Sequence, residues 1–191
     1  MAEIVVFHHV HGLTEGVESF AEMLRSAGHV VHVPDLFEGR TFSTLSDGLE
    51  YVQQVGFAEV MARGAAAVEE LPGELVYVGF SLGVLPAQLL AQTRPGARGA
   101  LLVHACLPVS EFGDQWPDGV PVQIHAMNND PEFTGADLEA ARELVVQARE
   151  AELFLYPGSE HLFADDSLSD YDEAAAGSLR ERALEFCRAV G

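Results

Sequence analysis

Short apolar runs alternate with longer segments of helical spacing along the whole chain, and this order limits the possible folds severely. Each run is followed by a segment whose apolar residues recur every three or four positions. Strands that alternate with helices in this way predict a mainly parallel sheet of about six strands, covered by helices on both faces. The expected strands are residues 4–8, 29–33, 75–79, 100–105, 120–126 and 152–156; the expected helices are 17–27, 48–70, 82–92, 137–150 and the C-terminal segment.

The length and composition fit a single domain over residues 1–191. Hydrophobic residues make up 48% of the 191 residues, which is enough for a sizeable core. No internal repeat, low-complexity tract or linker interrupts the pattern. Polar residues that follow the strands are therefore the candidates for function, because ligands of open parallel sheets bind beyond the carboxyl ends of the strands.

The net charge of −20 narrows the range of partners. The chain has ten Lys and Arg residues and 30 Asp and Glu residues, so a nucleic-acid partner is not expected. No apolar run is long enough for a bilayer span, and no secretory signal is expected at the N-terminus. Cys106 and Cys187 lack metal-ligand spacing and are expected to be reduced core residues, which fits a cytoplasmic protein.

The segment Gly79-Phe80-Ser81-Leu82-Gly83 lies between an expected strand and an expected helix. In that context G-x-S-x-G is typical of a nucleophile elbow, in which a sharp turn exposes the serine hydroxyl at the edge of the sheet. The N–H of Leu82, at the start of the helix, is then placed to bind an oxyanion. The alternative is a glycine-rich turn with an incidental serine.

A nucleophilic serine needs a base and an orienting acid, and both follow later strands. Asp130 is the first acid after the fifth expected strand, and His161 lies in the loop after the sixth. The order Ser81, Asp130, His161 is the order of a Ser-Asp-His triad on a fold of this type. Three other acids are out of order or too close to the histidine: Asp165, Asp166 and Glu160.

Three histidines, His8, His9 and His11, lie within four positions at the end of the first expected strand. A catalytic zinc site needs about three protein ligands, and no Asp-His pair follows to complete this one. A metal-dependent hydrolase built on His9 and His11 is therefore the second hypothesis, and a non-catalytic binding protein is the third. Candidate pocket residues are His9, His11, Phe80, His104 and Trp116; Trp116 could equally cover the sheet.

At these residues the chain resembles the dienelactone hydrolase family of α/β-hydrolases. The similarity covers nearly the whole length, and its most specific part is the C-terminal segment GSEHLFADDSLSDYDEAAAGSLRERALEFC. The resemblance implies an α/β-hydrolase fold without a separate lid domain. It also implies that the second oxyanion donor is the N–H of Val10, in the loop after the first strand.

Three positions depart from the prototype of that family. Ser81 stands where the prototype has a nucleophilic cysteine, which makes the base His161 indispensable. His9 stands at the position of a glutamate that handles the thiol, and Asp165 at that of an arginine that binds the substrate carboxylate. Arg40 is the only basic residue that can be placed near the pocket, so a neutral substrate is favoured over an anionic one.

The sequence therefore predicts a serine hydrolase that cleaves a small carboxylic ester or lactone through Ser81, His161 and Asp130. The reaction would pass through an acyl-enzyme intermediate, with Leu82 and Val10 donating to the oxyanion. No metal and no cofactor are expected, and the protein is expected to be a monomer or a homodimer.

Overall fold

A computed structural model describes residues 1–191 and contains a six-stranded sheet in the order β2-β1-β3-β4-β5-β6. All neighbouring strands are parallel, as expected. The carboxyl ends of the strands therefore lie at one edge of the sheet. The strands are β1 (Glu3–Phe7), β2 (Val30–His32), β3 (Leu75–Phe80), β4 (Gly99–Val103), β5 (Val122–Met127) and β6 (Ala151–Tyr156).

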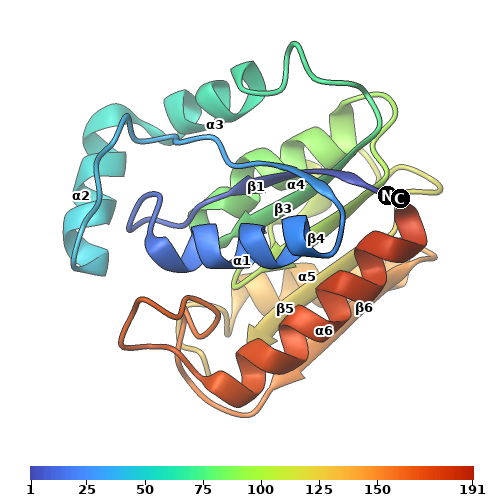
Figure 1. The fold of residues 1–191 in the computed structure, drawn as a ribbon. Coiled ribbons are helices and arrows are strands. Elements are labelled where there is room, and N and C mark those ends of the chain that lie inside the picture. The colour runs from blue at the N-terminus through green and yellow to red at the C-terminus, as the bar shows by residue number, and fades with distance from the viewer.

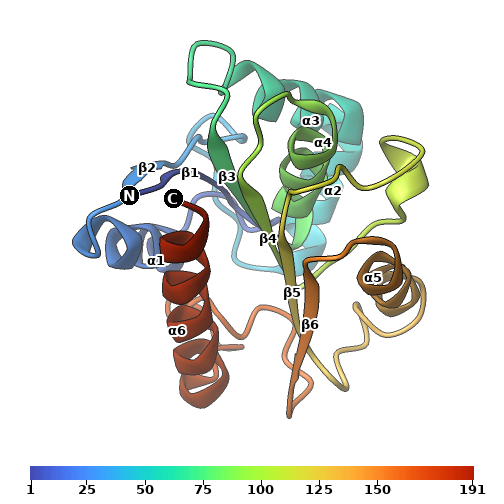
Figure 2. The same ribbon diagram turned by 90° about the vertical axis from the view of Figure 1, so that its right-hand side faces the viewer.

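Helices cover both faces of the sheet (Figures 1 and 2). Figure 2 shows α1 and α6 on one face and the remaining four helices on the other. They are α1 (Glu15–Ser26), α2 (Leu45–Val55), α3 (Phe57–Ala66), α4 (Val84–Thr93), α5 (Ala136–Gln147) and α6 (Glu173–Val190). None of these helices combines the length and the apolar composition that a membrane span requires.

The two faces of the sheet form two separate hydrophobic clusters because successive side chains of a strand point to opposite sides. In β1, Val5 and Phe7 join the cluster under α2 to α5, whereas Ile4 and Val6 join the one under α1 and α6. All four side chains are fully buried. The central strands consequently read as continuous apolar runs in the sequence, which is typical of parallel sheets.

Two helical expectations need correction. The single helix expected over residues 48–70 is two helices, α2 and α3, separated at Gly56, whose φ of 96° lies in the left-handed region. A residue in that conformation interrupts the helical ladder, and glycine adopts it without steric cost. The helix expected over residues 137–150 ends earlier, because α5 covers Ala136–Gln147 and the backbone of Ala148 is already extended.

Candidate active site

The turn after β3 has the geometry of a nucleophile elbow. Ser81 has a φ of 48°, a left-handed conformation that is uncommon for residues other than glycine. It begins a 3₁₀ turn, Ser81–Gly83, that leads directly into α4. The expected strand–turn–helix context of the serine is therefore present, with a backbone held in a sparsely populated region.

Both glycines of the elbow are required by close backbone contacts. A Cβ atom on Gly79 would lie 2.6 Å from the Cα atom of Val84, and one on Gly83 would lie 2.7 Å from the carbonyl oxygen of His8. The Cβ atom on Gly79 would also clash with the carbonyl oxygen of Gly83, and the one on Gly83 with the carbonyl oxygen of Phe7. The elbow thus packs against the end of β1, and the loop that follows β1 starts beside Ser81.

Ser81, His161 and Asp130 form a hydrogen-bonded chain. Ser81 Oγ lies 2.8 Å from His161 Nε2, and His161 Nδ1 lies 2.7 Å from Asp130 Oδ2. The contact with the Asp130 carboxyl places the ring proton on Nδ1, so Nε2 is left to accept from the serine hydroxyl. The His161 side chain is 13% exposed and that of Asp130 is fully buried.

Loop contacts hold the acid and the base in place. Asp130 follows β5, and its second oxygen, Oδ1, accepts from the N–H of Glu132 at 2.8 Å. The loop that carries His161 is tied to the end of β5 because Asn129 N–H donates to the carbonyl of Gly158 at 3.0 Å. The two loops therefore have a fixed relation to each other before a substrate binds.

The turn after β1 contains Val10, the expected second oxyanion donor. The N–H of Gly12 donates to the carbonyl of His9 at 3.0 Å and closes the turn around Val10. Gly48 of α2 packs against this turn, with a hypothetical Cβ only 3.0 Å from the Val10 carbonyl carbon. The Val10 N–H makes no hydrogen bond within the chain, so it is free to donate to a ligand.

The neighbouring histidines His8 and His11 form hydrogen bonds with backbone groups of the protein. His8 Nδ1 donates to the carbonyl of His9 at 2.8 Å, and its Nε2 accepts from the N–H of Leu36 at 3.0 Å. Burial lowers the pKa of His8 to about 4, so the ring is neutral. His11 donates from Nδ1 to the carbonyl of Phe42 at 2.8 Å. These imidazoles fasten the loop after β1 to the segments around Leu36 and Phe42.

His9 bonds to Asp165, which lies 156 positions away in the sequence. Its Nε2 is 2.7 Å from Asp165 Oδ2, and both side chains are buried. The sequence comparison with the prototype singled out both positions but gave no reason to pair them. Thr14 and Ser167 also donate to this carboxylate, and no motif in the sequence marks either of them for this contact.

His104 is an unusual residue at the end of β4. Its φ is 73°, and neither ring nitrogen has a hydrogen-bond partner although the side chain is buried. The ring lies 5.6 Å from that of His161 and 4.8 Å from that of Phe163, between centroids. Burial and, secondarily, the nearby His161 keep the pKa of His104 well below its usual value. The residue thus borders His161 from inside the protein.

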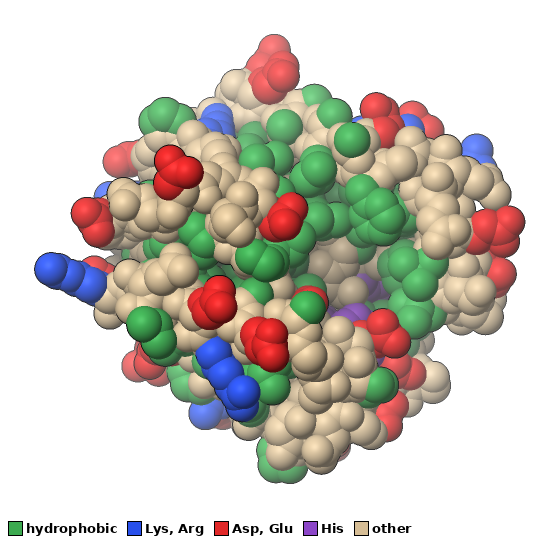
Figure 3. Space-filling model, turned by 180° about the vertical axis from the view of Figure 1, so that it is seen from behind, with side chains coloured by type: hydrophobic (Ala, Val, Ile, Leu, Met, Phe, Trp, Pro, Cys, Tyr) green, Lys and Arg blue, Asp and Glu red, His purple; other side chains and the backbone are tan.

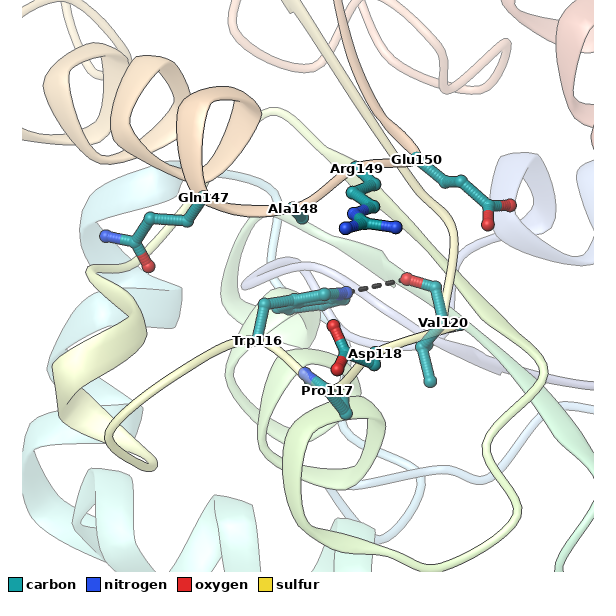
Figure 4. A pocket seen from close by; sticks show the side chains of 9 residues that line it. Trp116, Pro117, Asp118, Val120, Gln147, Ala148, Arg149 and Glu150 are labelled. Atoms are coloured by element: carbon teal, nitrogen blue, oxygen red, sulfur yellow. Dashed lines mark hydrogen bonds between the residues drawn. The ribbon is translucent and has the colours of Figure 1, made fainter.

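Two expected pocket residues lie elsewhere. Trp116 lines a cavity at the amino ends of β5 and β6, opposite the elbow, and its Nε1 donates to the carbonyl of Val120 at 2.7 Å (Figure 4). Phe80 is 2% exposed and packs edge-on against Phe20 of α1, with ring centroids 5.0 Å apart. Successive residues of a strand point to opposite faces of the sheet. Phe80 therefore points into the core, on the face opposite to that of its neighbour Ser81.

No group of three His, Cys, Asp or Glu side chains is arranged to hold a metal ion. His9 and His11 lie 5.5 Å apart between ring centroids, but each bonds to a protein oxygen. Figure 3 shows a hollow with histidine side chains at its base and hydrophobic side chains around it.

Known proteins share this fold. The chain superposes with a TM-score of 0.78 on a dienelactone hydrolase-like promiscuous phosphotriesterase from metagenomic libraries, at 18% identity over 100% of this chain and 87% of the other. A dienelactone hydrolase from Anabaena variabilis gives a TM-score of 0.71, at 18% identity over 99% and 87% of the two chains. The thioesterase RedJ from Streptomyces coelicolor gives 0.65, at 16% identity over 97% and 85%.

No curated protein has significant sequence similarity to the chain. The structural neighbours are all below 25% identity and establish the α/β-hydrolase fold. A family model, in contrast, matches every residue from 1 to 191, and it describes the dienelactone hydrolase family. The chain therefore belongs to the dienelactone hydrolase family.

Proposed function

We propose that the protein is a serine hydrolase that cleaves a small, neutral carboxylic ester or lactone through Ser81, His161 and Asp130. Membership of the family makes it a hydrolase that acts on ester bonds. The observation that carries the finer assignment is the continuous chain from Ser81 Oγ through His161 to Asp130, with contacts of 2.8 and 2.7 Å. These are the distances at which a base can take the hydroxyl proton.

In the proposed first step, Ser81 Oγ attacks the substrate carbonyl while His161 Nε2 accepts the hydroxyl proton. The carbonyl oxygen becomes an oxyanion, which the N–H groups of Leu82 and Val10 stabilise. His161 then passes its proton to the leaving oxygen as the carbon–oxygen bond breaks. This step leaves an acyl group on Ser81.

In the second step, His161 takes a proton from water, and the resulting hydroxide attacks the acyl carbon. The tetrahedral intermediate collapses, and the proton returns from His161 to Ser81 Oγ. Asp130 stays bonded to Nδ1 throughout, so it fixes the ring orientation and stabilises the imidazolium in both steps. The free acid is then released.

A neutral substrate is proposed because no Lys or Arg side chain forms an ion pair or a hydrogen bond with Ser81, His161 or Asp130. The chain carries a net charge of −20, and Asp165 occupies the position at which the prototype has an arginine. Arg40, the basic residue that the sequence suggests near the pocket, lies over the ring of Tyr51 at 5.3 Å. A thioester is compatible with the same chemistry, because the triad acts on the acyl carbon.

The direct test treats wild type and Ser81→Ala with a fluorophosphonate probe and with p-nitrophenyl acetate. The proposal expects stoichiometric labelling of Ser81 and turnover in wild type, and loss of both in the variant. A chelator should leave the rate unchanged. Equal turnover in Ser81→Ala would contradict the proposal, and rate loss with the chelator would favour the metal-dependent alternative.

A further inference from the structure

A second buried His–Asp pair lies beside the triad. His9 Nε2 and Asp165 Oδ2 are 2.7 Å apart, and the two side chains are 0% and 2% exposed. His9 belongs to the loop after β1, directly before Val10. Asp165 belongs to the loop between β6 and α6, which also carries His161. The pair therefore joins the two loops that carry the proposed oxyanion donor and the proposed base.

The proton positions on His9 follow from its neighbours. Nδ1 accepts from the N–H of His11 at 3.2 Å, so the ring proton is on Nε2 and is donated to Asp165. The carbonyl of His9 accepts from Gly12 N–H at 3.0 Å. Side chain and backbone of His9 thus fix the turn on both sides of Val10.

Asp165 is the centre of a larger network. Besides His9, its carboxylate accepts from the hydroxyl of Thr14, from the N–H of Ser167 at 2.9 Å and from the Ser167 hydroxyl at 2.6 Å. Thr14 is the N-cap of α1, and Gly16 in the same helix donates to Ser167 Oγ at 3.3 Å. The carboxylate therefore also anchors the start of α1 to the loop after His161.

We infer that the His9–Asp165 pair is a positioning device that holds the Val10 N–H in register with His161 and Ser81. The inference rests on the proposed function, since it assigns a role in stabilising the oxyanion of that reaction. Neither residue exchanges a proton with the substrate. Both act through the backbone of the turn, whose donor must be correctly placed before the oxyanion forms.

An ionised carboxylate is required at position 165. Burial alone would raise the pKa of Asp165, but the hydrogen bonds from His9, Ser167 and Thr14 hold it well below its usual range. All its partners donate: His9 and Thr14 to Oδ2, Ser167 N–H and hydroxyl to Oδ1. An asparagine in either orientation would direct its NH₂ at donors, so Asp165→Asn disrupts the network without removing bulk.

The test compares Asp165→Asn and His9→Gln with wild type. Acylation of Ser81 by p-nitrophenyl acetate is followed, active sites are counted with a fluorophosphonate, and a boronic acid serves as the transition-state analogue. A displaced oxyanion donor predicts that kcat per active site falls about 10- to 100-fold, with KM changed little. The affinity for the boronic acid should fall by a similar factor, and the pH profile of kcat/KM should keep the shape that it has in wild type.

The chain offers a matched control in His32, which bonds to Glu3 at 2.8 Å at the opposite end of β1. His32→Gln removes a His–carboxylate contact between β2 and the start of β1, and it should leave kcat and the boronic acid affinity unchanged. The kcat of the Asp165→Asn/His9→Gln double variant should be little lower than that of the less active single variant, because both substitutions break the same hydrogen bond.

The outcomes separate this inference from the proposed function. Turnover in Ser81→Ala equal to wild type would refute the triad itself. If Ser81→Ala is inactive but both variants keep wild-type kcat per active site and analogue affinity, only the positioning role is refuted. The positioning role would also be refuted if the variants lost activity only because fewer active sites react with the fluorophosphonate. Such a loss would reflect incomplete folding and not a displaced oxyanion donor. Should Asp165→Asn fail to fold, His9→Gln decides by the same criteria.

Discussion

His161 Nδ1 lies 2.7 Å from Asp130 Oδ2, and the acid is fully buried while the histidine reaches the surface. Asp130 is itself held by the N–H of Glu132, so it has little freedom to turn away. This contact selects the tautomer that leaves Nε2 free to accept from Ser81. The proposed chemistry therefore depends on Asp130 even though Asp130 never reaches the substrate.

Replacing Asp130 with asparagine should lower kcat by about three to four orders of magnitude. An amide NH₂ facing Nδ1 would favour the tautomer with the proton on Nε2, which cannot accept from the Ser81 hydroxyl. Steady-state hydrolysis of p-nitrophenyl acetate measures the effect. Asp166→Asn is the control, because Asp166 bonds to Arg180 at 3.0 Å on the surface and should be dispensable. A comparable loss in both variants would contradict the assignment of the acid.

Adding one methyl group at Gly83 should disrupt the elbow. A Cβ atom there would lie 2.7 Å from the carbonyl oxygen of His8 and closer still to that of Phe7. These are backbone atoms at the end of β1 and just after it, so they cannot move aside cheaply, and Gly83→Ala should cost about 1 to 3 kcal/mol. Urea denaturation would measure this loss, and the rate of Ser81 labelling should fall with it.

Gly177 provides the opposite case for the same substitution. It lies within α6, and no atom is within 4 Å of a hypothetical Cβ. Gly177→Ala should raise the free energy of unfolding by about 0.5 to 1 kcal/mol, because alanine loses less backbone entropy in a helix. Labelling of Ser81 should stay at the wild-type rate. If the Gly83→Ala variant were as stable and as reactive as wild type, the elbow would accommodate a methyl group for which the structure shows no room.

The sequence predicted the parallel sheet and the arrangement of Ser81, Asp130 and His161 because these depend on local patterns. Each residue follows its strand directly, and parallel strands place such positions at one edge. The left-handed backbone of Ser81 is likewise a property of the G-x-S-x-G turn. Here the local signals and the tertiary structure agree.

Other features depend on contacts that no local pattern encodes. His9 and Asp165 meet only because the sheet brings two distant loops together, and their spacing in the sequence carries no sign of the pair. Trp116 could not be assigned to one end of the sheet from a loop sequence alone. Gly56, in contrast, was a visible signal: an isolated glycine in a helical pattern weakens the helix, and here it ends one.

Substrate charge provides a further prediction. A net charge of −20 repels anions, and Asp165 adds an ionised carboxylate beside the site. We expect kcat/KM for p-nitrophenyl acetate to exceed that for mono-p-nitrophenyl succinate by about tenfold or more at low salt. The difference should shrink as salt screens the surface charges. Equal rates for both esters would mean that a cation binds the substrate carboxylate, and Arg40→Ala would then test whether Arg40 is that cation.

Acid stability should depend on buried neutral histidines. Burial lowers the pKa of His8 to about 4 and that of His125 to about 3, from a value of 6.5 in an unfolded chain. The native state therefore binds fewer protons than the unfolded state below pH 6.5. Their contribution to stability is complete above that pH and is lost as the pH falls toward 4 and 3. Because of each of these two histidines, the free energy of unfolding should fall by about 2 kcal/mol between pH 6.5 and pH 5.

His125→Phe isolates one of these contributions. The ring of His125 stacks on Phe154 at 5.1 Å and bonds to Tyr156, so phenylalanine keeps the stacking but has no titratable group. The free energy of unfolding, measured with urea at pH 7.5 and pH 5, should fall less steeply in the variant by about 2 kcal/mol over this range. The variant will be less stable at pH 7.5 because the Tyr156 hydroxyl loses one of its partners and keeps only Arg182, so the slope is the quantity to compare. An unchanged slope would place the proton uptake on other groups and would show that His125 titrates alike in the folded and unfolded chain.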